Sequence, residues 1–319
     1  MSSPIAIHAF HSGVLWASKG HKLLRKLGPD TEFTPYTAIP ISFPGDLLPP
    51  LNRLLRRGIH HILPLSSKRI VAVLKGQLLF LEDGNITHAR TIARGSRPLR
   101  SGICVLPDET IIYGDYWSNP ERQPVEMHLS RDGGKHWDTL WKSDAGEARH
   151  IHLVQPVAGT PGKIYFSTGD RDHEANLFTL DLSSGNVKKI GGGSQTWRMV
   201  SLLQTGDRII WGSDCEYGQN HIYHFDIATG KLEQLLDIPG PAYYSTRDSQ
   251  GRFYIATTVE DRRRHQATIF TSSTGHKWSI FRTFKKDLWP AKLFGYGTVE
   301  FIDGQEKIDS LLYNLKGLL

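Results

Sequence analysis

The sequence predicts an all-β protein, a six-bladed β-propeller, with five or seven blades as the alternatives. Three observations predict it: a repeat of about one blade in length, short strands rich in β-branched and aromatic residues, and many turn residues. The 31 Gly and 17 Pro suit short strands joined by tight turns and disfavour a helical bundle. A chain of 319 residues could form two domains, but the repeat favours a single domain over residues 1–319.

The repeat pairs an apolar strand that ends in a carboxylate with a second strand that is closed by a turn glycine. The first strands are Thr110–Asp115, Ile164–Asp170, Ile209–Asp214 and Phe253–Glu260. The second strands are Val125–Ser130, Leu177–Asp181, Ile222–Asp226 and Thr268–Ser272. Their closing glycines are Gly134, Gly185, Gly230 and Gly275, the last three at intervals of 45 residues. This period fits one four-stranded blade per repeat, and such blades bury both faces only by stacking around an axis.

The two ends of the chain are less regular. The segment Arg69–Gly84 has the pattern of a further blade with its own hairpin. We expect Thr298–Gly304 to pair with strands around Val14–Ala17, which would close the ring and hide its edge strands. Residues 29–65 interrupt the β pattern and predict a helical or irregular insertion. Within it, Leu47–Leu65 has the spacing of a basic amphipathic helix, which we expect on the propeller rim, with a weak membrane contact as the alternative.

Two eight-residue segments contain a short polar residue, a glycine and a final tryptophan. Ser130–Trp137 resembles the Asp-box (BNR repeat) of the sialidase superfamily, and Thr271–Trp278 is a weaker match in which Ser273 replaces the Asp. The polar side chain would cap a tight hairpin, and the Trp would pack between blades. The resemblance implies a sialidase-like propeller of the glycosyl-hydrolase type, in which the boxes themselves are structural turns.

Charge and cysteine content restrict the partner and the compartment. The net charge of +6 and the pI near 9.2 favour an anionic partner, and we expect an oligo- or polysaccharide, an acidic one included, rather than a nucleic acid. The two cysteines, Cys104 and Cys215, are too few for a disulfide framework and lack metal-type spacing. No apolar run reaches the roughly 18 residues of a membrane span, and the first residues do not form a signal peptide, so we expect a cytoplasmic protein.

Meander topology predicts which residues share one face of the propeller. In a blade of antiparallel strands, the end of each strand that carries a carboxylate lies beside the start of the inner strand that precedes it, so both contribute to the same mouth. The residues expected there are Arg100, Asp115, His150, His152, Asp170, His173, Glu174, Arg198, Asp214, Glu216, Tyr243, Tyr244 and Glu260. This mixture of cations, carboxylates, imidazoles and phenols suits a polar ligand. We call this mouth the funnel.

The sialidase resemblance implies a glycoside hydrolase that acts on a complex glycan. Such an enzyme would clamp a sugar carboxylate with arginines, here Arg100 and Arg198, and would use a Tyr activated by a Glu as nucleophile and Asp170 as acid. The predicted catalytic residues are Asp170, His173, Glu174, Asp214, Tyr243 and Glu260. The predicted substrate-binding residues are Arg100, Asp115, His150, His152, Arg198 and Tyr244.

The same funnel residues would also suit two other functions. A polysaccharide lyase would use a His or Tyr base beside a group that neutralises a uronate, and a non-catalytic propeller would bind glycans or proteins through the same funnel. No cofactor is expected. A divalent metal at His150, His152 and His173 is the alternative, because a His-x-His pair places both imidazoles on one face of a strand.

Overall fold

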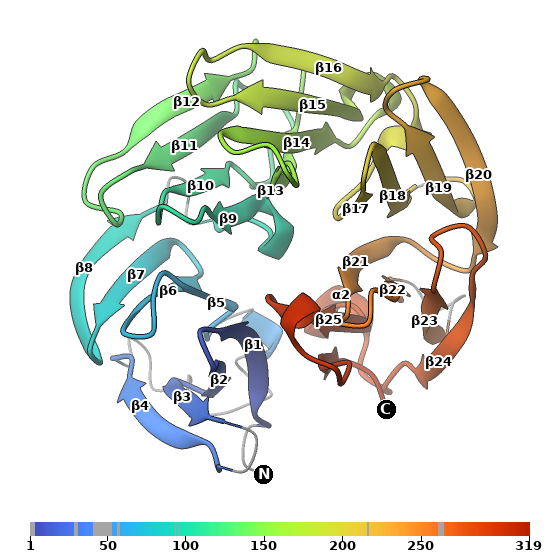
Figure 1. Cartoon of the computed structure of the whole chain (residues 1–319). Helices are drawn as coiled ribbons and strands as arrows, with labels where there is room; N and C mark the ends of the chain where they lie inside the picture. Colours follow the sequence, from blue (N-terminus) through green and yellow to red (C-terminus); the bar gives the residue numbers. More distant parts are fainter. Residues whose placement is uncertain are drawn as a thin grey trace.

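The chain forms a ring of six four-stranded antiparallel sheets, as predicted, and is a six-bladed β-propeller (Figure 1). The computed structural model describes residues 4–28, 31–40, 53–55, 58–92, 94, 96–215, 217–260 and 265–319, the side chain of Lys292 excepted. In every blade the strands pair in sequence order, and the first strand lies nearest the axis (Figure 1). Each blade is therefore a simple meander.

The strand boundaries match the predicted repeat. Blades 1 to 3 are β1 (Ala6–His11), β2 (Val14–Lys19), β3 (Lys22–Leu27) and β4 (Thr34–Ala38); β5 (His61–Pro64), β6 (Arg69–Leu74), β7 (Gln77–Glu82) and β8 (Asn85–Thr91); and β9 (Ile103–Val105), β10 (Ile111–Gly114), β11 (Glu126–Ser130) and β12 (Asp138–Lys142). Blades 4 to 6 are β13 (His150–Pro156), β14 (Lys163–Gly169), β15 (Asn176–Asp181) and β16 (Val187–Gly192); β17 (Leu203–Thr205), β18 (Arg208–Gly212), β19 (Asn220–Asp226) and β20 (Lys231–Ile238); and β21 (Ala242–Arg247), β22 (Phe253–Thr257), β23 (Gln266–Ser272) and β24 (Ser279–Lys285).

Short helical turns connect some of these strands. They are η3 (Arg100–Gly102), η4 (Asp172–Glu174), η5 (Gln195–Trp197), α2 (Ala291–Phe294) and η6 (Gln305–Lys307). Among the described residues, no helix is long and apolar enough to cross a membrane.

The ring closes through a hairpin at the end of the chain, and here the predicted pairing is corrected. Strand β25 (Thr298–Phe301) pairs with β26 (Tyr313–Lys316) and not with the segment Val14–Ala17. The contact with blade 1 is made by the residues that follow β25: the Phe10 amide donates to the Asp303 carbonyl at 2.8 Å, and the Asp303 amide donates to the His8 carbonyl at 3.0 Å. The hairpin therefore joins blade 6 to the innermost strand of blade 1.

The region 29–65 contains more strand than the sequence pattern suggested. It includes β4 of blade 1 and β5 of blade 2, so the predicted amphipathic helix over Leu47–Leu65 is wrong at its end, where His61–Pro64 forms an inner strand. Arg53–Leu55 are helical, and residues 41–52 of the predicted insertion lie outside the described part of the chain.

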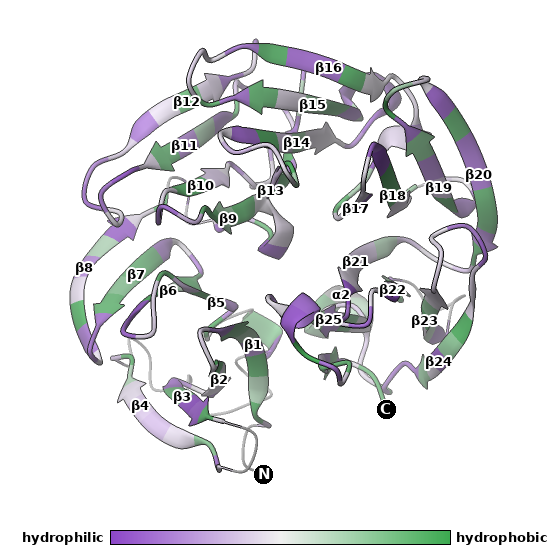
Figure 2. Cartoon of the chain, viewed as in Figure 1, coloured by the Kyte–Doolittle hydropathy of each residue, from purple (hydrophilic) through white to green (hydrophobic). Residues whose placement is uncertain are grey.

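The hydrophobic core lies between neighbouring blades. Each blade packs one sheet face on the next, and the cluster of Leu153, Tyr165, Leu177, Trp211 and Phe225 between blades 4 and 5 is typical. The outermost strands face solvent on one side, so β20 contains both polar and apolar residues (Figure 2). Packing between sheets holds the strand ends of different blades in fixed relative positions.

Both box-like turns have the geometry expected of a capped hairpin. In the first, Asp132 Oδ1 accepts hydrogen bonds from the amides of Lys135 and His136 at 3.0 and 2.9 Å, and Trp137 Nε1 donates to the Gly134 carbonyl. Gly134 has a φ of +90°, and a Cβ there would lie 2.1 Å from the Phe80 ring of blade 2. The turn needs glycine because of this positive φ and because it packs on the neighbouring blade with no space for a Cβ.

Candidate functional site

Side chains from the inner ends of several blades lie close together, as the meander topology predicts. Three inner strands carry a β-bulge at this mouth, at positions where one residue is left out of the pairing: His8 in β1, His152 in β13 and Tyr243 in β21. A bulge re-aims a side chain and is common beside functional sites. The funnel contains two groups of polar side chains, one around Asp170 and one around Arg100.

Asp170, at the end of β14, is surrounded by cationic and imidazole groups. Its Oδ1 lies 3.0 Å from His150 Nε2, 3.2 Å from His152 Nε2 and 3.3 Å from Arg198 Nη2. Its Oδ2 lies 2.8 Å from Arg149 Nη1. Asp170 is 6% exposed. Arg198 also pairs with Asp214, with Nε and Oδ2 3.2 Å apart, so blades 4 and 5 share one charge network.

This environment fixes the charge state of Asp170 and His152. Burial by itself would raise the pKa of Asp170, but the hydrogen bonds from His150 and His152 outweigh it and hold the pKa well below its usual value. Burial lowers the pKa of His152 to about 4, although Asp170 opposes that shift. At neutral pH Asp170 is therefore ionised and His152 is neutral.

Tyr243 and Glu260 form a second pair on the blade 6 side of the same group. The Tyr243 hydroxyl donates a hydrogen bond to Glu260 Oε1. Burial and then the charge of Asp214 raise the pKa of Tyr243 well above its usual value. Tyr116 also belongs here: its ring lies 4.3 Å from that of His150, and burial raises its pKa to about 12, with Asp170 and Asp214 adding to the shift.

The second group surrounds Arg100. The Arg100 Nη2 donates to the His8 carbonyl at 2.6 Å and lies 3.3 Å from Asp303 Oδ1, while its Nη1 is 3.9 Å from Glu300 Oε2. His61 Nε2 is 2.7 Å from Asp303 Oδ2. Burial opposes ionisation of Asp303, but the charges of His61 and Arg100 lower its pKa to about 2.

Tyr244 joins this second group, as its hydroxyl donates to Glu300 Oε1 at 3.4 Å. Burial raises the pKa of Tyr244, and the Glu300 carboxylate adds to the shift. Tyr243 and Tyr244 are neighbours in sequence, yet they contact different groups. Blade 6 therefore contributes to both halves of the funnel.

Most of the predicted site residues are brought together, and three have other contacts. The residues in the two groups are Arg100, His150, His152, Asp170, Arg198, Asp214, Tyr243, Tyr244 and Glu260. Asp115 accepts from the Glu126 amide and from His128 within its own blade, at 3.0 and 3.1 Å. Glu174 is fully buried, pairs with Arg122 Nε at 2.7 Å and accepts from the amides of Asp170 and Arg171, which shapes the loop after β14. The side chain of His173 is 63% exposed, and Glu216 lies outside the described residues.

Several residues of the funnel were not predicted from the sequence. They are His8, His61, Tyr116, Arg149, Glu300 and Asp303. Tyr116 and Arg149 directly adjoin predicted residues, so extending each strand end by one position would have found them. The other four come from blades 1 and 2 and from the closing hairpin, where the repeat is least regular.

The metal alternative has a different third ligand from the one predicted. His150, His152 and Asp170, rather than His173, bring their donor atoms within 4.8 Å of one another. The His152 Nδ1 is buried and has no hydrogen-bond partner among the described residues. Two guanidinium groups already contact Asp170, and their charge disfavours a divalent cation at this carboxylate. The donor set fits a metal, but its charge environment does not.

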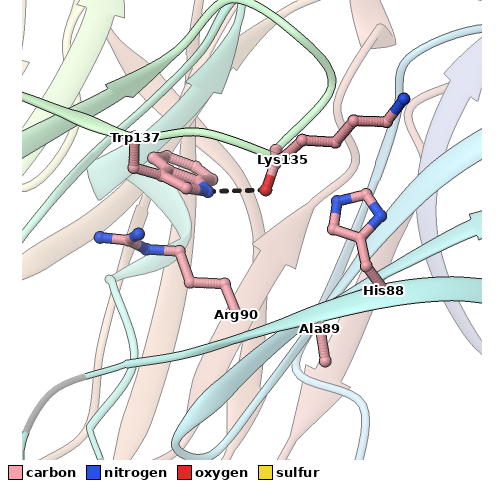
Figure 3. Close-up of a pocket in the computed structure, with 6 residues that line it drawn as sticks. His88, Ala89, Arg90, Lys135 and Trp137 are labelled. Carbon is pink, nitrogen blue, oxygen red and sulfur yellow. Dashed lines mark hydrogen bonds between the residues drawn. The ribbon is translucent and has the colours of Figure 1, made fainter.

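A shallow pocket outside the funnel lies between blades 2 and 3. It is lined by His88, Ala89, Arg90, Gly134, Lys135 and Trp137 (Figure 3). The Arg90 guanidinium carbon lies 4.4 Å from the centre of the Trp137 ring, and Arg90 Nε donates to Tyr113 at 2.7 Å. These groups pack on one another, so the pocket reflects the contact of the first box-like turn with β8.

Comparisons with known proteins support the fold alone. No family model and no curated protein matches the chain. Among solved structures, the GH74 enzyme of Niastella koreensis is similar at 13% identity and a TM-score of 0.56, with 86% of this chain and 44% of that enzyme covered. A luciferin-regenerating enzyme is similar at 13% identity and a TM-score of 0.46, with 100% of this chain and 84% of that enzyme covered. The chain is thus a β-propeller with a polar, charged funnel.

Proposed function

We propose that this propeller binds an acidic glycan in its funnel and hydrolyses a glycosidic bond there. The hydrogen bond from Tyr243 to Glu260 carries the proposal. A phenol is a weak nucleophile until a base takes its proton, and Glu260 is the group in contact with that proton. The two side chains come from the start of β21 and the loop after β22, both held by the packing of blade 6.

The raised pKa of Tyr243 sets how the pair would work. Burial and the Asp214 charge disfavour a free phenolate, so the proton would pass to Glu260 only as the Tyr243 oxygen bonds to the anomeric carbon. The developing positive charge of the sugar ring would be stabilised by the nearby carboxylates. The glycosidic C–O bond would break in the same step, and the leaving oxygen would take a proton from solvent. Water would then attack the anomeric carbon and break its bond to the Tyr243 oxygen, which would regain a proton through Glu260.

The structure changes the role that we assign to Asp170. An aspartate whose pKa is held well below its usual value cannot supply a proton at neutral pH, so the predicted role as general acid is withdrawn. Asp170 instead positions Arg149 and Arg198, which it contacts at 2.8 and 3.3 Å. These guanidinium groups, with Arg100 across the funnel, would attract the acidic groups of the glycan.

A lyase is the second candidate, and one observation favours it. The Nδ1 atom of the neutral His152 has no hydrogen-bond partner among the described residues, and an imidazole nitrogen that can accept a proton beside arginines is what β-elimination from a uronate requires. The two reactions leave different products. Hydrolysis yields saturated reducing ends, whereas elimination yields an unsaturated uronate that absorbs ultraviolet light.

The test uses the full chain and a panel of acidic oligosaccharides, with reducing ends and ultraviolet absorbance recorded together. We expect new reducing ends without new absorbance, and a loss of at least about 100-fold in kcat for Tyr243→Phe with glycan binding retained. Tyr36→Phe is the matched control. Tyr36 lies on the outer strand β4, and the substitution removes a hydroxyl that donates to the Lys68 carbonyl. Absorbance that depends on His152 would establish the lyase, and binding without any product would overturn both reactions.

A further inference from the structure

A second group of metal-type donors lies away from the funnel, between blades 5 and 6. His224 on β19, Glu233 on β20 and His276 in the turn after β23 bring their donor atoms within 4.8 Å of one another. The His224 and His276 rings are 4.6 Å apart between centroids and meet edge to face. Neither the proposed hydrolysis nor the packing of the core uses these three side chains.

His224 is buried without a hydrogen-bond partner. It is 5% exposed, and neither of its ring nitrogens makes a hydrogen bond with the described residues. The nearest acceptor is Glu233 Oε2, 3.5 Å from Nδ1. A buried polar group left unpaired is destabilising, so an imidazole in this state indicates a missing ligand.

The surrounding structure holds the three donors in place. The turn that carries His276 packs directly on blade 5, where a Cβ on Gly275 would lie 2.5 Å from Ile210 Cδ1. The turn is fixed further by Trp278 Nε1, which donates to the Gly275 carbonyl at 3.1 Å. On Glu233, the exposed Lys231 contacts Oε1 at 2.5 Å, which leaves Oε2 for the two histidines.

We propose that His224, Glu233 and His276 bind a divalent transition-metal ion, for which Zn²⁺ is the best fit. Two imidazoles and one carboxylate are a common zinc ligand set, with water in the fourth position. His276 is exposed, so the side of the site on which it lies leaves room for that water. The cation that contacts this carboxylate is one exposed lysine, whereas Asp170 in the funnel contacts two arginines. The ion would cross-link blade 5 to blade 6.

The test is titration of the metal-free full chain with ZnCl₂ by calorimetry, together with Co²⁺ absorption spectra. We expect one tight site, tetrahedral Co²⁺ bands, a rise in Tm with Zn²⁺, and no comparable response to Mg²⁺, which prefers oxygen ligands. His276→Asn and Glu233→Gln should each weaken Zn²⁺ binding by about 100-fold or more. His276 is an exposed turn residue, so its variant tests the site even if a His224 variant fails to fold.

His136→Asn is the matched control, because His136 lies in the other box-like turn, is 92% exposed and pairs with Asp132. Its Zn²⁺ affinity should be unchanged. The proposal is overturned if the chain binds no Zn²⁺ in the micromolar range or if both variants of the site keep full affinity. It is equally overturned if affinity is lost in His150→Asn instead, which would place the ion in the funnel.

Discussion

Asp170 and Glu260 follow equivalent strands of blades 4 and 6, yet their surroundings are opposite. Asp170 lies within 3.3 Å of two imidazoles and two guanidinium groups. Glu260 accepts a hydrogen bond from the neutral phenol of Tyr243. A carboxylate surrounded by cations stays ionised and serves to position them, whereas one paired with a phenol can take up a proton during a reaction. Under the proposed function, the same position in two repeats thus supports structure in one blade and chemistry in another.

The largest expected effect comes from removing the charge of Asp170. Asp170→Asn removes the carboxylate that Arg149 contacts and leaves Arg198 paired with Asp214 alone, and we expect the free energy of unfolding to fall by about 3–5 kcal/mol. Urea denaturation measures it. Asp172→Asn, an exposed neighbour that accepts from Gln195 and Tyr217, is the control and should change stability by less than about 0.5 kcal/mol. Equal effects of the two variants would contradict the positioning role.

The second effect is a pH dependence set by His152. Its pKa is about 4 in the folded chain and near 6.5 when unfolded, so between these values the unfolded state binds more protons. The free energy of unfolding should therefore fall as pH decreases from about 6.5 to 4, by ~3 kcal/mol for this group. Denaturation curves measured at several pH values in this range give the free energy of unfolding, which should depend less steeply on pH in His152→Asn. An unchanged slope would show that other groups, such as the buried His8, account for it.

A smaller effect is expected from Gly169→Ala, which tests the packing beside Asp170. A Cβ at this position would lie 2.3 Å from His152 Cε1 and would push the ring away from Asp170. We expect a loss of about 1–3 kcal/mol in the free energy of unfolding. Gly102→Ala is the control, because the nearest atom to its Cβ would be at an ordinary 3.5 Å.

The smallest change in stability should come from Glu260→Gln, although this variant should lose the proposed hydrolysis. The amide oxygen can still accept the Tyr243 hydrogen bond, and no buried cation of the described residues contacts Glu260, so the free energy of unfolding should change by less than about 1 kcal/mol. The kcat for glycan hydrolysis should fall by at least about 100-fold, since an amide cannot take the phenol proton. A stability loss as large as that of Asp170→Asn would remove the contrast between the two carboxylates.

The sequence predicted the blades and about half of the funnel, for identifiable reasons. Asp170, Asp214 and Glu260 were predictable because an apolar strand that ends in a carboxylate recurs in each regular blade. The β-bulges at His8, His152 and Tyr243 were not, because one residue left out of a strand pairing has no signature in the hydrophobic pattern. The partners of Arg100 also depend on how the ring closes, which rests on contacts between the two ends of the chain.

Asp303 links the closing of the ring to the building of the funnel. Its backbone bonds to blade 1, while its side chain contacts His61 and Arg100. If the seam between the first and last blades opened, half of the charged mouth would be dismantled in the same step. A ligand bound against Arg100 would consequently stabilise the closed ring. Exchange of the Phe10 amide proton with solvent deuterium should then be slower in the presence of the ligand.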